Sequence, residues 1–333
     1  MYIGTCATIK TMQQKMKHAP QDDLALRAAL DAYLAGGRVP FSEGYWQYRE
    51  QFLQEVLNGE ARLAWFHEGG ILPAEYGTRL DERVVEYPWL LSHLQKKYTR
   101  LLDAGATLIY PFLLKLPTFR GKTIVVYTLA PEEWVYIQPN VSYVYGDLRE
   151  TLFKNKVFHE IVCLSTLEHI GMDNTQLYVG DARYRENEPR AYRQVLREIR
   201  RLLVPGGRLY LTVPYGRYEH LGWLQQFDEP LLQDAIETFH GETLSLTFFK
   251  YGVNGWQKAD AAQCADCRYF DVHRAREFEA DYAAAARAVA CVVLRKPFRL
   301  ERVDTFLQAV RAHSRANAFL KGVRARVRAA RKA

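Results

Sequence analysis

An uninterrupted apolar run near the middle of the chain ends abruptly in polar and titratable residues. Residues 161–164 read Ile-Val-Cys-Leu, and a run without polar alternation is typical of a strand covered on both faces of a parallel sheet. The residues that follow include Ser165, Thr166, Glu168 and His169. Parallel α/β sheets open their ligand crevices outside the carboxyl ends of their strands. The pattern therefore predicts a ligand site directly after residue 164.

The rest of the hydrophobic pattern predicts an α/β fold. Helical periodicity covers residues 22–35, a second helix is expected from a cap at Ser42 to about residue 57, and a short apolar helix is expected after Pro88. From about residue 99 to residue 297, strand-like and helix-like stretches alternate, which favours a mostly parallel sheet with helices on both faces. These stretches are residues 106–116, 122–133, 141–150, 160–171, 190–203, 207–216 and 283–296.

Composition and cysteine usage narrow the class of protein. With 333 residues, of which 48% are hydrophobic, the chain can bury a large core as one elaborated domain or two small ones. No stretch reaches the roughly 18 apolar residues of a membrane span, and the first residues lack the apolar region of a secretory signal. The five cysteines lack framework spacing, and Cys264 and Cys267 form a C-x-x-C without a second ligand pair. We therefore expect a cytoplasmic protein with reduced thiols and no metal.

The net charge of +7 is concentrated in the last 33 residues. Nine Lys or Arg side chains lie between residues 301 and 333 against two acids, so residues 1–300 hold 36 charges of each sign. Apolar residues recur there at helical intervals, which predicts a basic amphipathic helix. This helix packs on the domain or on a second subunit in one interpretation, and contacts the inner membrane surface or an anionic glycolipid in the other. Nucleic acid is disfavoured because aromatic residues do not interleave with the basic ones.

Five motifs occur in an order that resembles a known enzyme superfamily. They are LLDAGATL, TIVVYTLAPEE, YVYGDLRE, IVCLSTLEHIG and LLVPGGRLYLTVP, within residues 98–213. This order resembles the class I S-adenosylmethionine-dependent methyltransferases, which have a Rossmann-like fold, and AARAVACVVLRK is similar to the antiparallel last strand of that fold. The segments SEGYWQYR, LDERVVEYPW and NGWQ extend the resemblance to a poorly characterised bacterial subgroup associated with surface-polysaccharide synthesis.

The resemblance implies three parts of the chain. Residues 1–95 are expected to form an N-terminal helical or lid extension, and residues 96–297 the methyltransferase domain, with acceptor-binding insertions in 216–275. Residues 298–333 are the basic amphipathic tail. The dense charges of residues 81–89 form either a lid over the cofactor or a salt-bridged brace for the N-terminal helices.

S-adenosylmethionine is the cofactor that the resemblance implies, and matching positions supply its binding residues. Asp147 matches the adenine contact of the family, while Ser165 and Thr166 would lie under the methionine moiety. Capping of a turn is the alternative role for Asp147, and capping of a strand end is the alternative for Ser165 and Thr166. The full set carried over is Asp103, Gly105, Ala106, Thr107, Thr128, Leu129, Asp147, Leu148, Ser165 and Thr166.

Two departures from the family pattern concern this cofactor site. Residues 103–107 keep the acid and one glycine only, where the family usually has more glycines to let the backbone approach the cofactor. Thr128 stands where an acid usually binds the ribose hydroxyls, and one hydroxyl does not replace two charged acceptors. Glu132 or Glu133 could reach the ribose instead, or they are solvated residues at a helix cap.

The acid–base residues expected after the fourth strand are Glu168 and His169. A hydroxyl acceptor is almost wholly protonated at neutral pH, so a general base is useful, and His169 has the right titration range and position. Glu168 would orient this histidine or bind substrate. The alternative for His169 is a core histidine hydrogen-bonded to the backbone.

Acceptor recognition is expected from aromatic and polar residues outside the parallel strands. Aromatic faces beside amides and a carboxylate suit a sugar ring, which has apolar CH patches and many hydroxyls. Aromatic residues also fill cores, which is the alternative for Trp223. The predicted acceptor-binding residues are Tyr215, Tyr218, His220, Trp223, Gln225, Gln226, Asp228 and Trp256.

These observations predict an S-adenosylmethionine-dependent O-methyltransferase that acts on a sugar hydroxyl of a bacterial glycan, glycolipid or nucleotide sugar. It would work in the cytoplasm, or at the periphery of the inner membrane through its tail, as a monomer or a homo-oligomer. Two alternatives are a catalytically silent methyltransferase-like binding protein, which the weakened glycine motif favours, and an RNA methyltransferase guided by the basic tail.

Overall fold

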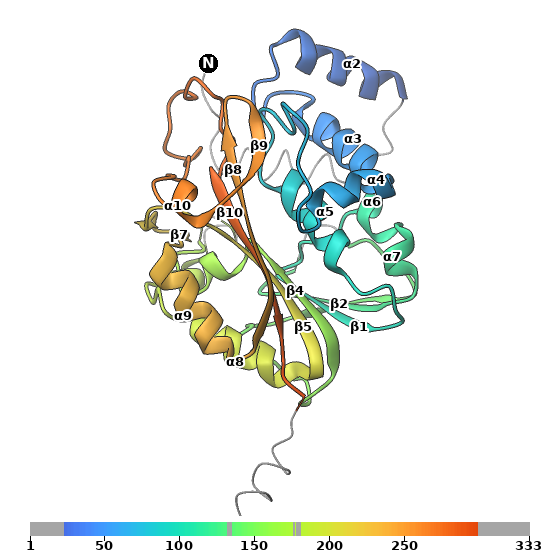
Figure 1. Ribbon diagram of the computed structural model, residues 1–333, viewed down its shortest axis with the longest axis vertical. Helices are drawn as coiled ribbons and strands as arrows, with labels where there is room; N and C mark the ends of the chain where they lie inside the picture. Colours follow the sequence, from blue (N-terminus) through green and yellow to red (C-terminus); the bar gives the residue numbers. More distant parts are fainter. Residues whose placement is uncertain (1–22, 132–134, 176, 178–180, 299–333) are drawn as a thin grey trace, which may run out of the picture. The chain divides into compact units, whose positions relative to one another are not determined.

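Eight strands form one mixed sheet in the order β3-β2-β1-β4-β5-β10-β8-β9 (Figure 1). The computed structural model describes residues 23–131, 135–175, 177 and 181–298. Strands β1 to β5 pair in parallel, whereas β10 is antiparallel to both β5 and β8, and β9 is antiparallel to β8. A mostly parallel sheet with an antiparallel last strand is therefore confirmed. The strands of this sheet are β1 (Arg100–Ala104), β2 (Thr123–Thr128), β3 (Val141–Tyr145), β4 (Phe158–Leu164), β5 (Leu203–Pro214), β8 (Glu242–Gly252), β9 (Gly255–Ala259) and β10 (Ala288–Arg295), and the small hairpin is β6 (Glu219–His220) with β7 (Gln225–Gln226).

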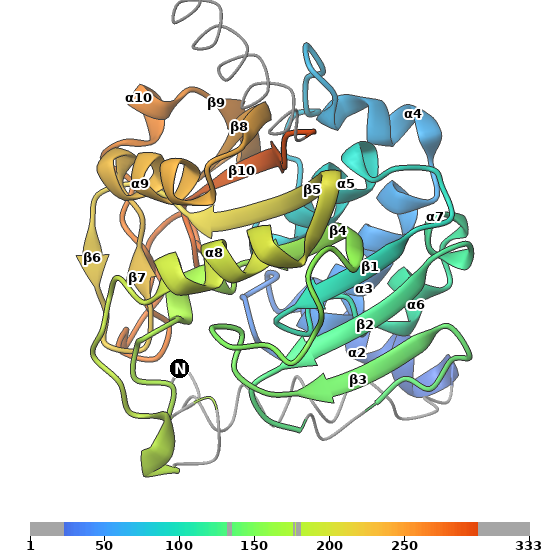
Figure 2. The same ribbon diagram turned by 90° about the horizontal axis from the view of Figure 1, so that it is seen from below.

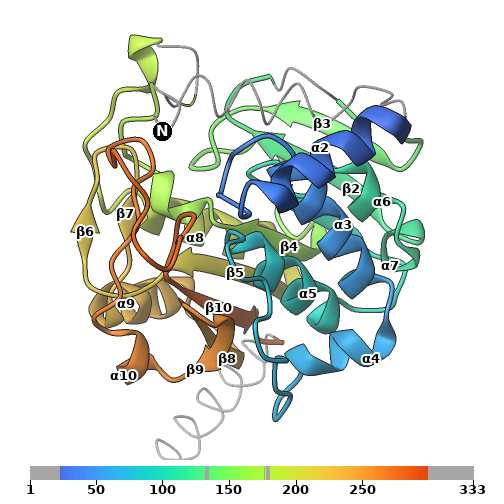
Figure 3. The same ribbon diagram turned by 90° about the horizontal axis from the view of Figure 1, so that it is seen from above.

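Helices cover both faces of the sheet, as the uninterrupted apolar strands predict. Figures 2 and 3 show α2, α3 and α5 on one side and α8 and α9 on the other. Alternate residues of β4 point to the two faces of the sheet. Val162 packs in the core that contains Trp89 of α5, and Cys163 packs in the core that contains Ile199 of α8. The helices are α2 (Asp23–Ala35), α3 (Tyr45–Leu57), α4 (Glu60–Leu63), α5 (Arg83–His93), α6 (Pro111–Leu114), α7 (Pro117–Arg120), α8 (Tyr192–Leu202), α9 (Glu229–Phe239) and α10 (Ala261–Cys264).

Two predicted helix boundaries are wrong, each for a local reason. Helix α5 begins at Arg83 and contains Pro88. A proline leaves the carbonyl four residues earlier without its helical donor, and here the hydroxyl of Tyr76 donates to the carbonyl of Val84 at 2.7 Å. Ser42 does not cap α3, because its hydroxyl donates to the carbonyl of Val39 and the helix starts later, after Gly44.

The chain divides after Lys296. The compact unit before this point holds all the elements named above. Of the predicted basic tail, residues 299–333 lie outside the described residues. Among the residues that are described, no helix combines the length and the apolar character that a membrane crossing needs.

Candidate functional site

A cavity of about 300 Å³ lies at the carboxyl ends of β1, β2, β3 and β4. This volume is at the lower end of the range for small-molecule sites. The position is the one predicted from the apolar run that ends at residue 164, because the loop after β4 forms one wall. Nine of the ten predicted cofactor residues line the cavity: Gly105, Ala106, Thr107, Thr128, Leu129, Asp147, Leu148, Ser165 and Thr166.

Asp103 is the predicted cofactor residue that does not line this cavity. Its carboxylate is fully buried and accepts hydrogen bonds from the backbone N–H groups of Thr107 and Leu108 and from the hydroxyl of Thr107. Burial raises the pKa of Asp103 to about 6, although these hydrogen bonds oppose the shift. Asp103 thus shapes the loop after β1, and the neighbouring residues face the cavity.

Gly105 is required by the close approach of two loops. Its φ is +116°, and a Cβ atom there would lie 2.2 Å from the hydroxyl oxygen of Thr166. Ala106 and Ser165 also have positive φ values, of 56° and 37°, which non-glycine residues adopt at a cost. The single glycine of this motif therefore stands where the backbone needs it, and Ala106 and Ser165 place two strained residues on the cavity wall.

An arginine that the sequence motifs did not indicate bridges two acids of the cavity wall. The guanidinium of Arg149 binds the carboxylate of Asp147 at 2.6 Å and that of Glu186 at 2.7 Å. The backbone N–H of Arg149 also donates to Asp147 at 2.8 Å, which is the turn cap given above as the alternative role. Burial alone would raise the pKa of Asp147, but the hydrogen bonds from Arg149 outweigh it and hold the pKa below its usual value.

Helix α5 is tied to the site through a buried glutamate. One carboxylate oxygen of Glu86 accepts from the hydroxyl of Ser165 at 2.6 Å and from that of Thr212 at 2.5 Å. The other oxygen of Glu86 pairs with the guanidinium of Arg83 at 2.6 Å. Arg83 and Tyr87 line the cavity themselves. The charged segment therefore braces the N-terminal helices and also forms one wall.

His169 lies on the cavity wall with its two ring nitrogens in different surroundings. Nδ1 is 3.0 Å from the carbonyl oxygen of Trp223, and since a carbonyl only accepts, Nδ1 carries the proton and Nε2 keeps its lone pair. Burial lowers the pKa of His169 to about 4. The imidazole is thus neutral at pH 7. The backbone contact given above as the alternative for His169 is present, and it leaves Nε2 available.

Glu168 is buried beside His169 without full hydrogen bonding. Its side chain is 2% exposed, and Oε1 is 3.9 Å from Nε2 of His169. The second oxygen, Oε2, is buried and has no hydrogen-bond partner. Burial raises the pKa of Glu168 well above its ordinary value, because a carboxylate loses the solvation of its charge when it is enclosed.

The predicted acceptor residues are not brought together as a group, and none of the eight lines the cavity. Trp223 is the one whose ring stacks beside His169, at 5.3 Å between centroids. The others take structural or surface positions. Gln225 and Gln226 donate to the carbonyls of Pro189 and Cys267, Asp228 caps α9, Trp256 donates to the carbonyl of Leu80 in the core, Tyr215 packs on Phe248, Tyr218 is exposed, and His220 contacts Asn187.

Two residues beyond β9 extend the surface around Trp223, and no motif pointed to their role. The ring centroid of Trp223 lies 6.1 Å from that of Tyr269 and 5.1 Å from that of His273. We call Trp223, Tyr269 and His273 the aromatic wall. Asp271 lies behind it and accepts from the indole N–H of Trp223 at 3.4 Å. Their common segment has no apolar periodicity that would have marked it in the sequence.

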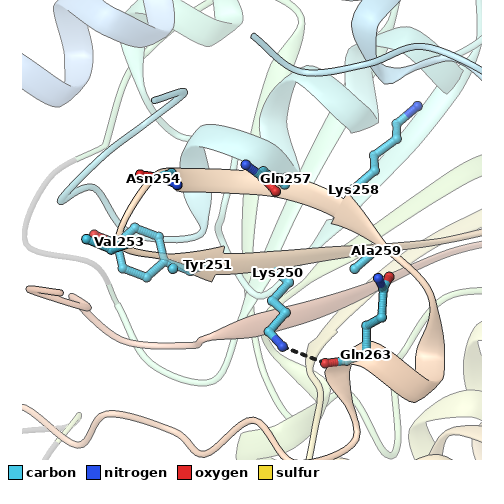
Figure 4. A pocket seen from close by; sticks show the side chains of 10 residues that line it. Lys250, Tyr251, Val253, Asn254, Gln257, Lys258, Ala259 and Gln263 are labelled. Atoms are coloured by element: carbon cyan, nitrogen blue, oxygen red, sulfur yellow. Dashed lines mark hydrogen bonds between the residues drawn. The ribbon is translucent and has the colours of Figure 1, made fainter. Parts of the chain in front are cut away.

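Two other hollows within the described residues have no histidine in their lining. One of about 380 Å³ lies along the β8–β9 hairpin, where Lys250 donates to the carbonyl of Gln263 at 2.7 Å (Figure 4). Another, of about 520 Å³, lies near the amino ends of β1 and β2 beside Lys96, Lys97 and Arg120. The cavity at the carboxyl edge is therefore the candidate active site.

No protein-family model matches the chain, and no curated protein matches it either. Among solved structures, the 1,6-didemethyltoxoflavin-N1-methyltransferase of Burkholderia thailandensis, crystallised with bound 1,6-didemethyltoxoflavin and S-adenosylhomocysteine, is 15% identical, with 84% of this chain and 93% of that chain covered and a TM-score of 0.39. The N-methyltransferase NodS of Bradyrhizobium japonicum is 13% identical, with 74% and 98% covered and a TM-score of 0.39. The cyclase SpnF is 17% identical, with 78% and 98% covered and a TM-score of 0.39. Likenesses this distant do not transfer a reaction to this chain.

Proposed function

We propose that this protein is an S-adenosylmethionine-dependent methyltransferase that methylates a sugar hydroxyl of a bacterial glycan, glycolipid or nucleotide sugar. The observation that carries the proposal is the cavity at the carboxyl edge of the sheet, where nine of the ten predicted cofactor residues meet His169. The motif order of the sequence and the strand order of the sheet both support it. A cytoplasmic location and contact of the basic tail with the inner membrane are parts of the same proposal.

The residues of the cavity fit the proposed cofactor. Gly105 brings the loop after β1 against Thr166, with no room for a Cβ atom, so the backbone itself forms the floor. Thr128 and Asp147 would face the ribose and the adenine amine, and Leu148 would contact the ring. Asp147 must share or exchange its contacts with Arg149 to do so.

His169 is the proposed general base. When bound, S-adenosylmethionine supplies a methyl group that its sulfonium has already activated. The carbonyl of Trp223 holds Nδ1–H of His169, so Nε2 can accept the proton of an acceptor hydroxyl. Because burial keeps the imidazole neutral, Nε2 is unprotonated throughout the neutral range. The wall formed by Arg83 and Tyr87 of α5 would orient the acceptor, and such positioning can supply much of the acceleration.

Calorimetric titration with S-adenosylhomocysteine tests the cofactor part of the proposal. Micromolar binding is expected, and no binding at millimolar ligand would contradict it. Methyl transfer to a panel of glycosides and nucleotide sugars then tests the reaction. His169→Asn should leave the affinity for S-adenosylhomocysteine unchanged and lower turnover by about 100-fold or more. His240→Asn, at the exposed C-cap of α9, is the matched control and should keep full activity.

A catalytically silent binding protein is the second candidate. The observation in its favour is that Arg149 already occupies the carboxylate proposed to bind adenine, and bridges it to Glu186. The same titration separates the two functions, because a silent protein would give no heat with either S-adenosylmethionine or its product.

A further inference from the structure

Two buried glutamates, Glu86 and Glu168, and the partly buried Glu82 interact with one arginine beside the candidate active site. We call Glu82, Glu86 and Glu168 the acid cluster. Arg83 pairs directly with Glu86 at 2.6 Å, and Arg83 is also the cation whose charge acts on the other two carboxyls. Their neighbour Asp81 is balanced separately by Arg49, at 2.5 Å. If fully ionised, the cluster would hold three negative charges against one positive charge.

Two members of the acid cluster have a buried oxygen with no partner. These atoms are Oε2 of Glu82 and Oε2 of Glu168, in both cases shielded from solvent. Glu168 is the stronger evidence for a missing partner, because the whole residue is 1% exposed. Buried polar atoms in native proteins nearly always have a hydrogen-bond partner, so each exception calls for an explanation. A ligand that donates hydrogen bonds or carries positive charge is such an explanation.

The cluster adjoins both the cavity and the aromatic wall. Glu168 contacts His169, which lines the cavity, and Arg83 lines it from α5. The phenol of Tyr269 is close enough to Glu82 and Glu168 to feel both charges. An acid of the cluster and the ring of Trp223 therefore both adjoin His169, which lines the cavity. This pairing is the one that binds an ammonium group on an otherwise hydroxylated ring, through charged hydrogen bonds and cation–π contact.

We propose that the acid cluster, through Glu82 and Glu168, binds an ammonium group of the acceptor, so that the substrate is an amino sugar rather than a neutral one. This inference rests on the proposed methyltransferase function and names its substrate class. An ammonium has three donors, which suffice for the two unpartnered oxygens. Its charge would favour the ionised forms of Glu82 and Glu168 beside Arg83, which a neutral hydroxyl would not do.

The test compares amino glycosides with their neutral counterparts on the full-length protein. The probes are the methyl glycosides of glucosamine, galactosamine and mannosamine, paired with those of glucose, galactose and mannose, and titrated with S-adenosylhomocysteine present. At least one amino glycoside should bind tenfold or more tightly than its neutral partner. Glu168→Gln and Glu82→Gln should each remove this preference. Glu237→Gln, an exposed acid on α9, should keep it.

The controls distinguish failure of the amino-sugar inference from failure of the proposed methyltransferase function. Absence of S-adenosylhomocysteine binding to the wild type overturns the proposed function. With that binding intact, equal affinity for the two glycosides of every pair, or no binding of any amino glycoside at millimolar concentration, overturns the amino-sugar inference alone. If Glu168→Gln weakens S-adenosylhomocysteine as much as it weakens the amino glycoside, the acids hold the cofactor's own amino group, and the inference is also overturned.

Discussion

Two buried glutamates near the two ends of β4 have opposite surroundings. Glu160 lies within the strand, toward its amino end, and Glu168 follows its carboxyl end; they are 0% and 1% exposed. Glu160 accepts from Lys122 and from the hydroxyls of Thr99, at 2.5 Å, and Tyr210, at 2.9 Å. Glu168 keeps one oxygen without any partner.

The difference separates a fully hydrogen-bonded polar network from one with an unpartnered oxygen. At the amino edge of the sheet, a charge is enclosed only with its full set of donors, because an uncompensated buried charge costs several kcal/mol. At the carboxyl edge, Oε2 of Glu168 has no donor among the described residues. Groups left in this state cluster at sites that await a ligand. The contrast supports the proposal that the carboxyl end of β4 serves binding, whereas the amino end holds a structural network.

The largest expected effect comes from breaking the closed network. Lys122→Met removes the buried cation that pairs with Glu160 and should lower the free energy of unfolding by about 3 to 5 kcal/mol, the usual result of stranding one member of a buried pair. Urea unfolding measures the change. The double variant Lys122→Met with Glu160→Gln should recover part of the loss. A single variant within about 1 kcal/mol of the wild type would show that the network is not what stabilises this edge.

The same substitution at both glutamates sharpens the comparison. Glu160→Gln should destabilise the fold by about 1 to 3 kcal/mol, because an amide replaces a carboxylate that accepts from four donors. Glu168→Gln should be neutral or stabilising, since it removes a buried acid with an unpartnered oxygen. Parallel urea unfolding of the two variants gives both values. Equal losses would mean that Glu168 has a structural role equivalent to that of Glu160.

The positions of residues at the carboxyl edge of the sheet could be predicted from the sequence better than those at the amino edge, for a physical reason. Apolar runs reveal strands buried on both faces, and the residue directly after such a run is placed at the sheet edge by the backbone alone. Ser165, Thr166 and His169 could therefore be located without knowing any contact. The partners of Ser165 could not, because Glu86 lies 79 residues away and reaches it only through the packing of α5 on the sheet.

The surroundings of the predicted acceptor-binding residues were harder to foresee, because the type of a residue does not show which way its side chain points. Trp223 and Trp256 look alike in the sequence, yet the first stands beside His169 and the second donates to the carbonyl of Leu80 in the core. Gln225 and Gln226 were chosen as sugar-binding amides, but they satisfy backbone carbonyls of neighbouring loops. Arg149 and Glu186 were missed because an ion pair between loops leaves no periodic signal.

The free energy of unfolding should depend on pH because of an acid near the carboxyl edge of the sheet, Glu82. Burial, and then the nearby acids Asp81 and Glu86, raise the pKa of Glu82 from 4.5 to about 8. The folded protein therefore holds a proton between these values that the unfolded chain has released, so stability is fully present below about pH 4.5 and falls as the pH rises toward 8. Glu82→Gln removes this loss. Between pH 5 and 8 the variant should gain at least about 1.4 kcal/mol relative to the wild type, the value of one pKa unit. Parallel stability profiles would contradict the shift.

The smallest expected change in stability lies at the far side of the cavity, where an acid is satisfied by a movable partner. Arg149→Met frees Asp147 and Glu186 from an ion pair that is partly exposed, so the free energy of unfolding should change by less than about 1 kcal/mol. Removal of the Arg149 charge should strengthen binding rather than weaken it. With Asp147 released, the affinity for S-adenosylhomocysteine should rise several-fold. Arg193→Met, which breaks the partly exposed pair with Asp234 away from the cavity, is the matched control and should leave the affinity unchanged. Calorimetry on both variants decides the point. A weaker affinity in Arg149→Met alone would mean that Arg149 itself binds the cofactor. The cavity would then bind through an ion-paired arginine on one side, while the acids with unpartnered oxygens lie on the other.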